Sequence, residues 1–214
     1  MNVFEFGLLR GLHEVLGCPF MDFLMPLVTK LGDHGIFCIA VAVALLCFKK
    51  TRRAGVMMGI ALLCGFICGN LFLKNVVARP RPYDLPGVQV DLLVARLHDY
   101  SFPSGHTLAC FEMASVLMLT HRKTLGPPAL IIAAAVAFSR LYLFVHYPTD
   151  VLAGALLGTL FGFLGVYLGR RLYMRGEMFF AKRAAERDMA TGLAVVTYLQ
   201  HATPAAFYAH VGNR

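Results

Sequence analysis

Charged residues are scarce in this sequence. Only 15% of the 214 residues are charged, whereas 58% are hydrophobic, and the mean hydropathy is +0.65. Soluble domains carry about 25% charged residues, so this composition excludes an ordinary soluble domain. It predicts instead a single domain embedded in a membrane.

Patterns typical of several other protein classes are also missing. The six cysteines lie in or beside apolar segments and lack partners at zinc-site spacing, so we interpret them as small buried hydrophobic residues. No basic start, apolar run and cleavage site follow one another as in a signal peptide. No cluster of carboxylates could hold Mg²⁺. We therefore expect no metal and no cofactor, and nothing indicates a nucleic-acid partner or an obligatory protein partner.

Apolar segments divide the chain into candidate membrane helices. Most approach the length of about 17 to 25 residues that spans the hydrocarbon of a bilayer. Residues 20–31 could form a short further span, and residues 1–18 have the pattern of an amphipathic interfacial helix. The predicted fold class is all-α, a polytopic transmembrane helical bundle with a short sixth span before five clear ones: 34–48, 54–73, 104–120, 126–145 and 149–169. We expect one membrane-embedded domain over 1–187 and a tail over 188–214.

Basic residues follow the first, third and fifth of these five segments. With alternating spans they all fall on one side of the membrane, which the positive-inside rule makes the cytoplasmic side. The clusters are Lys49, Lys50, Arg52 and Arg53; His121, Arg122 and Lys123; and Arg170, Arg171, Arg175, Lys182, Arg183 and Arg187.

Three short stretches gather ionisable residues at the opposite ends of the segments. They are KNVVARPRP (74–82), PSGH (103–106) and SRLYLFVHYPTD (139–150). Ionisable groups beside hydrocarbon cost free energy, so such a cluster indicates a functional site. The topology predicted from the basic clusters places all three stretches at the extracytoplasmic face.

The cations of these stretches suit a phosphate dianion. Arginine donates through a planar fork and lysine through a compact charge, so Lys74, Arg81 and Arg140 could form a phosphate cage. Alternatively, Lys74 and Arg81 could snorkel or bind lipid headgroups, whereas Arg140 lies in an uncharged run and needs a partner. Arg79 is interpreted as a headgroup-binding or solvent-facing residue.

The PSGH stretch has the pattern of a helix start. Pro103 and Ser104 would lie at the entry, where free N–H groups favour an anion and Gly105 allows close approach. His106, beside that anion, could be protonated and donate a proton to a leaving oxygen. Alternatively, it is merely a satisfied histidine at a helix end. Glu112 falls on another face of this helix and is expected to bond to a polar group on a neighbouring helix, outside the site.

His146 and Asp150 are four residues apart and would share one face of a helical turn. A carboxylate that binds one imidazole nitrogen fixes the tautomer and leaves the other nitrogen as a nucleophile or base. Asp150 could also be a helix N-terminal acid that the helix dipole stabilises by about 0.3 to 1 kcal/mol. The two roles can coexist.

Taken together, the three stretches resemble the signature of the type 2 phosphatidic acid phosphatase superfamily, which is shared with vanadium haloperoxidases. Every position is filled: Lys, six residues, Arg-Pro; Pro-Ser-Gly-His; Ser-Arg, five residues, His, three residues, Asp. The resemblance implies a six-helix core and a phosphohistidine at His146. It further implies that His106 protonates the leaving alkoxide and that water then releases phosphate.

The function that the resemblance implies is hydrolysis of a terminal phosphate from a lipid phosphomonoester or pyrophosphate without a metal. The substrate could be of the phosphatidic acid, phosphatidylglycerophosphate or undecaprenyl pyrophosphate type, and no residue chooses among them. The small chain resembles bacterial members, so we expect a multi-pass protein of the inner (plasma) membrane. The alternatives are a non-catalytic lipid-phosphate binder or transporter, and a vanadate-dependent haloperoxidase. The intact His106, His146 and Asp150 argue against the first, and the membrane spans argue against the second.

Overall fold

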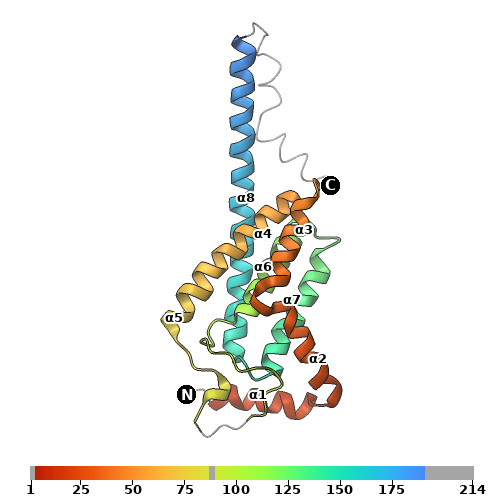
Figure 1. Ribbon diagram of the computed structural model, residues 1–214, viewed down its shortest axis with the longest axis vertical. Helices are drawn as coiled ribbons and strands as arrows, with labels where there is room; N and C mark the ends of the chain where they lie inside the picture. The colour runs from red at the N-terminus through yellow and green to blue at the C-terminus, as the bar shows by residue number, and fades with distance from the viewer. Residues whose placement is uncertain (1–2, 87–89, 191–214) are drawn as a thin grey trace. The chain divides into compact units, whose positions relative to one another are not determined.

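A computed structural model describes residues 3–86 and 90–190, which fold into helices and connecting loops (Figure 1). No strand occurs in this described part, so the predicted all-α class is confirmed. The α-helices are α1 (Val3–Leu16), α2 (Pro19–Thr29), α3 (Ile36–Cys47), α4 (Arg52–Gly65), α5 (Lys74–Val77), α6 (Gly105–Thr120), α7 (Gly126–Tyr142) and α8 (Pro148–Ala190).

Helix α6 is the centre of the packing. It packs against α7, α4 and the 3₁₀ segment Lys30–Gly35. Glycines of α8 let that helix approach α6 closely, because a Cβ atom on Gly154 would lie 2.7 Å from the carbonyl oxygen of Ser104, and one on Gly158 2.4 Å from that of Leu108. Small residues allow helix backbones to approach in this way inside membranes. The PSGH stretch is thereby fixed against the start of α8.

A break in the backbone separates α2 from α3. The 3₁₀ segment Lys30–Gly35 contains an extended residue, Asp33, with ψ 119°, followed by His34 and Gly35 at φ 50° and 67°. The left-handed region is uncommon for a residue other than glycine, so the chain turns sharply here. Helices therefore form over both segments expected near 20–31 and 34–48, with a defined kink between them.

The second predicted segment, 54–73, is one continuous helical stretch with a change of pitch. Helix α4 passes into a π-helix over Phe66–Leu73 and then into the short α5. The stretch ends at Ala78, whose φ is 45°. A π-helical turn often lies beside a functional site. Here it brings Asn70 and Lys74 to the end of the stretch.

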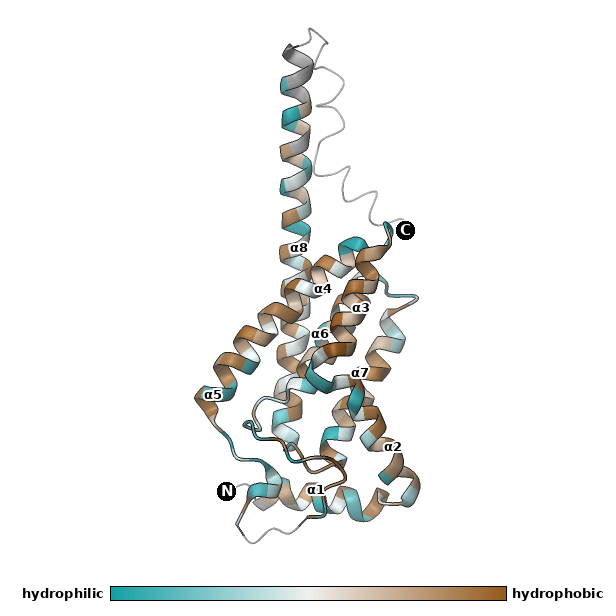
Figure 2. Ribbon diagram, viewed as in Figure 1, coloured by the Kyte–Doolittle hydropathy of each residue, from teal (hydrophilic) through white to brown (hydrophobic). Residues whose placement is uncertain are grey.

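Three helical stretches are long and apolar enough to cross a membrane, by length and composition: Pro19–Cys47, Arg52–Asp84 and Pro148–Ala184. Helix α7 is a shorter apolar helix. Hydrophobic residues cover much of α2, α3 and α4 (Figure 2), and large apolar side chains on these helices, including Phe23, Ile39 and Leu63, face outward. These features are those of a multi-pass membrane protein.

Contacts divide the chain into two units, Met1–Gly169 and Arg170–Arg214. Helix α8 begins in the first unit and runs to Ala190, so the predicted segment 149–169 is the first part of a longer helix. All residues of the three motif stretches belong to the first unit. Most of the expected tail, 191–214, lies outside the described residues, and the domain boundary at 187 stays a prediction.

Candidate active site

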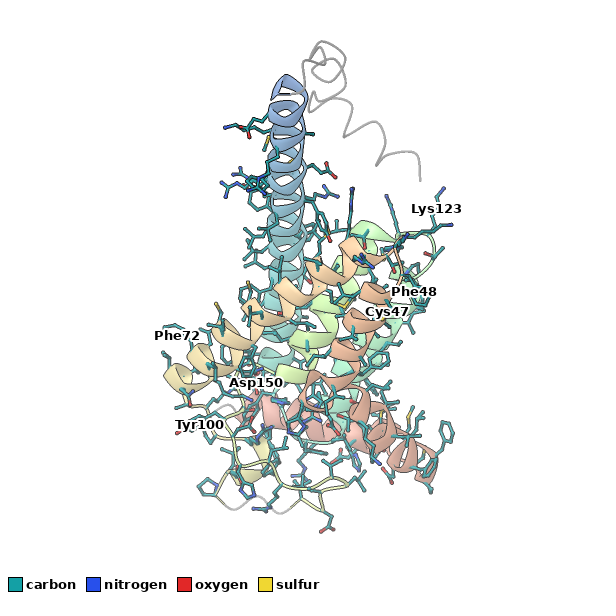
Figure 3. The ribbon with its side chains drawn as sticks, turned by 45° about the horizontal axis from the view of Figure 1, so that its top comes forward. Cys47, Phe48, Phe72, Tyr100, Lys123 and Asp150 are labelled. Atoms are coloured by element: carbon teal, nitrogen blue, oxygen red, sulfur yellow. The ribbon has the colours of Figure 1, made fainter. Side chains whose placement is uncertain are left out.

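The three motif stretches meet at one end of the first unit. Asp150 and Tyr100 lie at this end, and Cys47, Phe48 and Lys123 lie at the opposite end (Figure 3). Helix α1 lies across the lower end of the first unit in Figure 1, and Arg79 joins its Glu5 to Asp150. The site is therefore built from α5, the starts of α6 and α8, the end of α7, and the loop between α5 and α6.

His146 lies between the Arg81 guanidinium and a hydrogen-bonded pair, Ser101 and Asp150. Its Nε2 lies 3.4 Å from Nη1 of Arg81, and because arginine can only donate, Nε2 is the acceptor and the ring proton belongs on Nδ1. Nδ1 lies 3.4 Å from Oγ of Ser101, which donates to Oδ2 of Asp150 at 2.5 Å. The direct distance from Nδ1 to Asp150 Oδ2 is 3.7 Å. Only Asp150 lies in α8, and His146 precedes that helix, so the predicted shared helical turn is wrong. The serine hydroxyl connects the two residues instead.

The protonation of His146 follows from its surroundings. The residue lies between α7 and α8 and is buried. Burial, reinforced by the positive charges of Arg140 and Arg81, lowers the pKa of His146 to about 3, although Asp150 acts in the opposite direction. The ring is therefore neutral at physiological pH, with a lone pair on the nitrogen that faces Arg81.

Arg81 is fully enclosed by acceptors. Its Nη1 donates to the carbonyl oxygen of Val145 at 2.8 Å, its Nε donates to that of Asp99 at 2.8 Å, and its Nη2 donates to the Asp99 carboxylate at 2.5 Å. The same carboxylate also pairs with Lys74. These two cations outweigh the effect of burial and lower the pKa of Asp99 to about 2. An anion is thus already bound between two of the three predicted cage cations.

Two hydrogen-bond donors of Arg140 are unpaired among the described residues. Its guanidinium is buried at the end of α7 and donates from Nη1 to the hydroxyl of Thr29 on α2. Within residues 3–86 and 90–190, its Nε and Nη2 have no hydrogen-bond partner. Buried unpaired donors are costly, and an anion would satisfy them. The sequence predicted that Arg140 needs a partner but did not identify one, and Thr29 is such a partner.

The PSGH stretch starts a helix, as predicted. Gly105 is the first residue of α6 and Ser104 is the N-cap, although its hydroxyl contacts that of Thr107 at 3.0 Å and makes no capping bond to the backbone. A Cβ atom on Gly105 would lie 2.8 Å from Oδ1 of Asn70, so the Gly105 backbone packs closely against this side chain. His106 follows in the first turn, with Nε2 2.8 Å from Oδ1 of Asp33.

Comparisons with known proteins settle the family. Residues 50–173, which contain all three motif stretches, match the PAP2 superfamily. The chain belongs to the PAP2 superfamily. A solved structure of LpxE from Aquifex aeolicus superimposes with a TM-score of 0.65 and 28% identity, over 75% of this chain and 93% of that one. The first transmembrane PAP2-type phosphatidylglycerolphosphate phosphatase of Bacillus subtilis gives 0.61 and 25%, over 80% and 88%.

Sequence relatives agree with this assignment. An undecaprenyl-diphosphatase of Sulfolobus acidocaldarius is 37% identical over 145 residues, which is 68% of this chain and 69% of the relative. The resemblance stated from the three stretches is therefore confirmed. The matched region begins at residue 50, so α1, α2 and α3 of this PAP2 protein lie outside it.

The interpretation of Arg79 was wrong. The side chain is only 18% exposed and bridges two carboxylates: Nη1 lies 2.6 Å from Oδ1 of Asp150, and Nη2 lies 2.5 Å from Oε2 of Glu5. Glu5 also accepts from the backbone N–H of Thr149, at 3.0 Å. Helix α1 is thus tied to the start of α8 through the PAP2 site. The exposure of Arg79 to headgroups could not be judged from the sequence, because both of its carboxylate partners are distant along the chain.

Glu112 lies in α6 away from these residues, as expected. It is buried against α4, since a Cβ atom on Gly65 would lie 1.7 Å from its Oε1. The expected polar partner was wrong for this oxygen, which has no hydrogen-bond partner among the described residues. An acid in such surroundings is expected to be neutral. Sequence reasoning also missed Ser101, Asp99, Asn70, Thr29 and Asp33, of which the first three stand within four residues of a motif stretch.

Proposed function

We propose that this PAP2 protein is an integral membrane lipid phosphatase that removes a terminal phosphate through a phosphohistidine intermediate. The observation that carries the proposal is the orientation of His146. Its proton-free Nε2 faces the cation cage, whereas Nδ1–H faces Ser101 and Asp150. An imidazole held in this tautomer would direct its nucleophilic nitrogen toward a phosphate that binds beside Arg81.

The residues have separate tasks in this mechanism. Lys74, Arg81 and Arg140 stabilise the charge on the equatorial phosphate oxygens, assisted by the start of α6 at Ser104 and Gly105. Nε2 of His146 forms a bond to phosphorus as the bond to the leaving oxygen breaks, and His106 gives that oxygen a proton. Water then attacks phosphorus and gives a proton back to His106, which releases phosphate and free His146.

The substrate is a lipid phosphomonoester or diphosphate. The undecaprenyl-diphosphatase relative supports an isoprenoid diphosphate, and the phosphatidylglycerolphosphate phosphatase structure supports a phospholipid monoester. The test is phosphate release by purified protein in detergent from undecaprenyl diphosphate, phosphatidylglycerophosphate and phosphatidic acid. His146→Ala is the negative control. Binding without turnover on all three lipids would favour the alternative, a lipid-phosphate binder or transporter.

The cage cations supply the positive charge that Mg²⁺ provides in many phosphoryl-transfer enzymes. Activity is therefore expected to survive excess EDTA. Loss with EDTA and recovery with Mg²⁺ would contradict this part of the proposal.

We further propose five spans plus the short helix α2, in the plasma membrane, with the site on the extracytoplasmic side. The opposite positions of Asp150 and Lys123 support this orientation, because Lys123 belongs to a basic cluster (Figure 3). Asp91→Cys, in the loop before α6, should react with an impermeant thiol reagent in intact cells. Thr124→Cys, between α6 and α7, should react only after lysis. Both variants require a background without reactive native cysteines, and the reverse order would overturn the orientation.

A further inference from the structure

A carboxylate outside every motif contacts the second histidine of the site. Oδ1 of Asp33 lies 2.8 Å from Nε2 of His106, and the two residues are 73 positions apart. Asp33 belongs to the 3₁₀ segment between α2 and α3, ahead of the region that matches the PAP2 superfamily. Nothing in the proposed mechanism uses it so far.

The backbone around Asp33 fits the imidazole ring closely. A Cβ atom on Gly32 would lie 2.7 Å from Cδ2 and 2.9 Å from Cβ of His106, so the ring packs directly on the backbone of a glycine. The left-handed His34 and Gly35 then turn the chain away into α3. The kink thus presents a flat surface and a carboxylate to the same side chain.

The charges that face His106 explain why a carboxylate there would favour the protonated imidazole. Arg140 from α7 and Lys74 from α5 act on the ring electrostatically, as does Asp33 from the 3₁₀ segment. Burial of the ring and the two cations oppose a positive charge on the imidazole, and the carboxylate in contact favours it. A general acid must carry its proton before the leaving group departs, so the carboxylate supports the form that the reaction needs.

We propose that Asp33 is a positioning residue for the general acid, accepting the Nε2–H of His106 so that Nδ1–H is the proton given to the leaving oxygen. This inference rests on the proposed function. When the bond from phosphorus to the leaving oxygen breaks, that oxygen keeps the electron pair and takes the proton from Nδ1. Nε2 keeps its proton and its hydrogen bond to Asp33 throughout. In the second step Nδ1 accepts a proton from the attacking water, which restores the imidazolium.

The test compares substrates that differ in their need for an acid. Asp33→Asn should lower kcat about 10- to 100-fold on a lipid phosphate, whose alkoxide leaves poorly, and less than about threefold on an activated aryl phosphate. KM should stay unchanged on both. The basic limb of the rate profile should move to lower pH, because the imidazolium loses its proton more readily without the carboxylate. Asp33→Glu should restore part of the activity.

His34→Asn is the matched control. His34 is exposed in the same turn, and asparagine tolerates its left-handed φ, so this variant should behave as wild type on both substrates. Size-exclusion profiles in detergent should be the same for all variants.

Two results would overturn the inference. Equal losses on both substrate classes with an unchanged pH profile would assign Asp33 a purely structural role. A higher rate in Asp33→Asn would mean that the carboxylate sequesters His106. The proposed function fails separately, if wild-type protein releases no phosphate from any lipid or if His146→Ala remains active.

Discussion

The two histidines of the site are held in contrasting ways. His146 receives its carboxylate from the first turn of α8, four residues along the chain, and its side chain is 2% exposed. His106 receives its carboxylate from a kink 73 residues away, and its side chain is 16% exposed. The nucleophile thus has its carboxylate close by in the sequence, although Arg81 and Ser101, which also contact it, are distant. The acid receives its carboxylate from an element that meets α6 only in the folded protein.

This difference suits the two proposed tasks. A nucleophile must keep one tautomer, and enclosure by Arg81, Ser101 and Asp150 holds it there. An acid must lose and regain a proton in each cycle, so partial access to solvent is compatible with its role.

The largest effect is expected for the nucleophile. His146→Ala should reduce turnover by about 10⁴-fold or more on every substrate, because no other group can form the bond to phosphorus. Phosphate release measured on protein with a wild-type size-exclusion profile checks this. Activity within tenfold of wild type would remove His146 from the role.

A smaller and substrate-dependent effect is expected for the acid. His106→Ala should cost about 10²- to 10³-fold on lipid phosphates, within the usual range for general acid catalysis, and about tenfold or less on an activated aryl phosphate. Comparing kcat on the two classes measures the difference. A uniform loss would make the two histidines alike and contradict the contrast.

The network behind His146 should have an intermediate effect of about tenfold. Ser101→Ala removes the hydroxyl that connects Nδ1 to Asp150, and Glu5→Gln weakens the contact of Arg79 with α1. Both changes leave the nucleophile and cage in place, so kcat should fall while phosphate inhibition stays unchanged. Glu14→Gln, also on α1 but exposed, is the control and should have no effect.

The smallest effect is expected for the protonation of His146, which should not change over the physiological pH range. A pKa of about 3 means that the neutral form of His146 persists as the pH falls, because burial disfavours the charged ring. Nitrogen NMR of histidine-labelled protein should therefore show no protonation of His146 between pH 8 and pH 5, with the resonance assigned from His146→Asn. Protonation near pH 6.5 would show that the ring is not enclosed as described.

Much of the fold and site could be predicted because the residues that indicate them lie close together in the sequence. Apolar segments give the helical class, and Asp150 could be expected near His146 because the two are only four residues apart, although His146 precedes α8. The cage cations lie within two of the motif stretches, Lys74 and Arg81 in 74–82 and Arg140 in 139–150. Arg140 could be recognised as needing a partner, because a lone cation in an apolar run is costly.

The remaining contacts join positions that the sequence leaves far apart. Asp33, Thr29 and Glu5 precede the family motifs by dozens of residues, and each contacts a motif residue only after α1 and α2 pack against the ends of α6, α7 and α8. For the same reason Arg79 could not be distinguished from a headgroup-binding residue. The sequence by itself determined which chemical groups are present and the spacing of those on one helix. Apart from Asp150 at His146, tertiary packing decided which carboxylate or hydroxyl faces each cation and each histidine, because hydrogen bonds act over about 3 Å in space, whatever the separation along the chain.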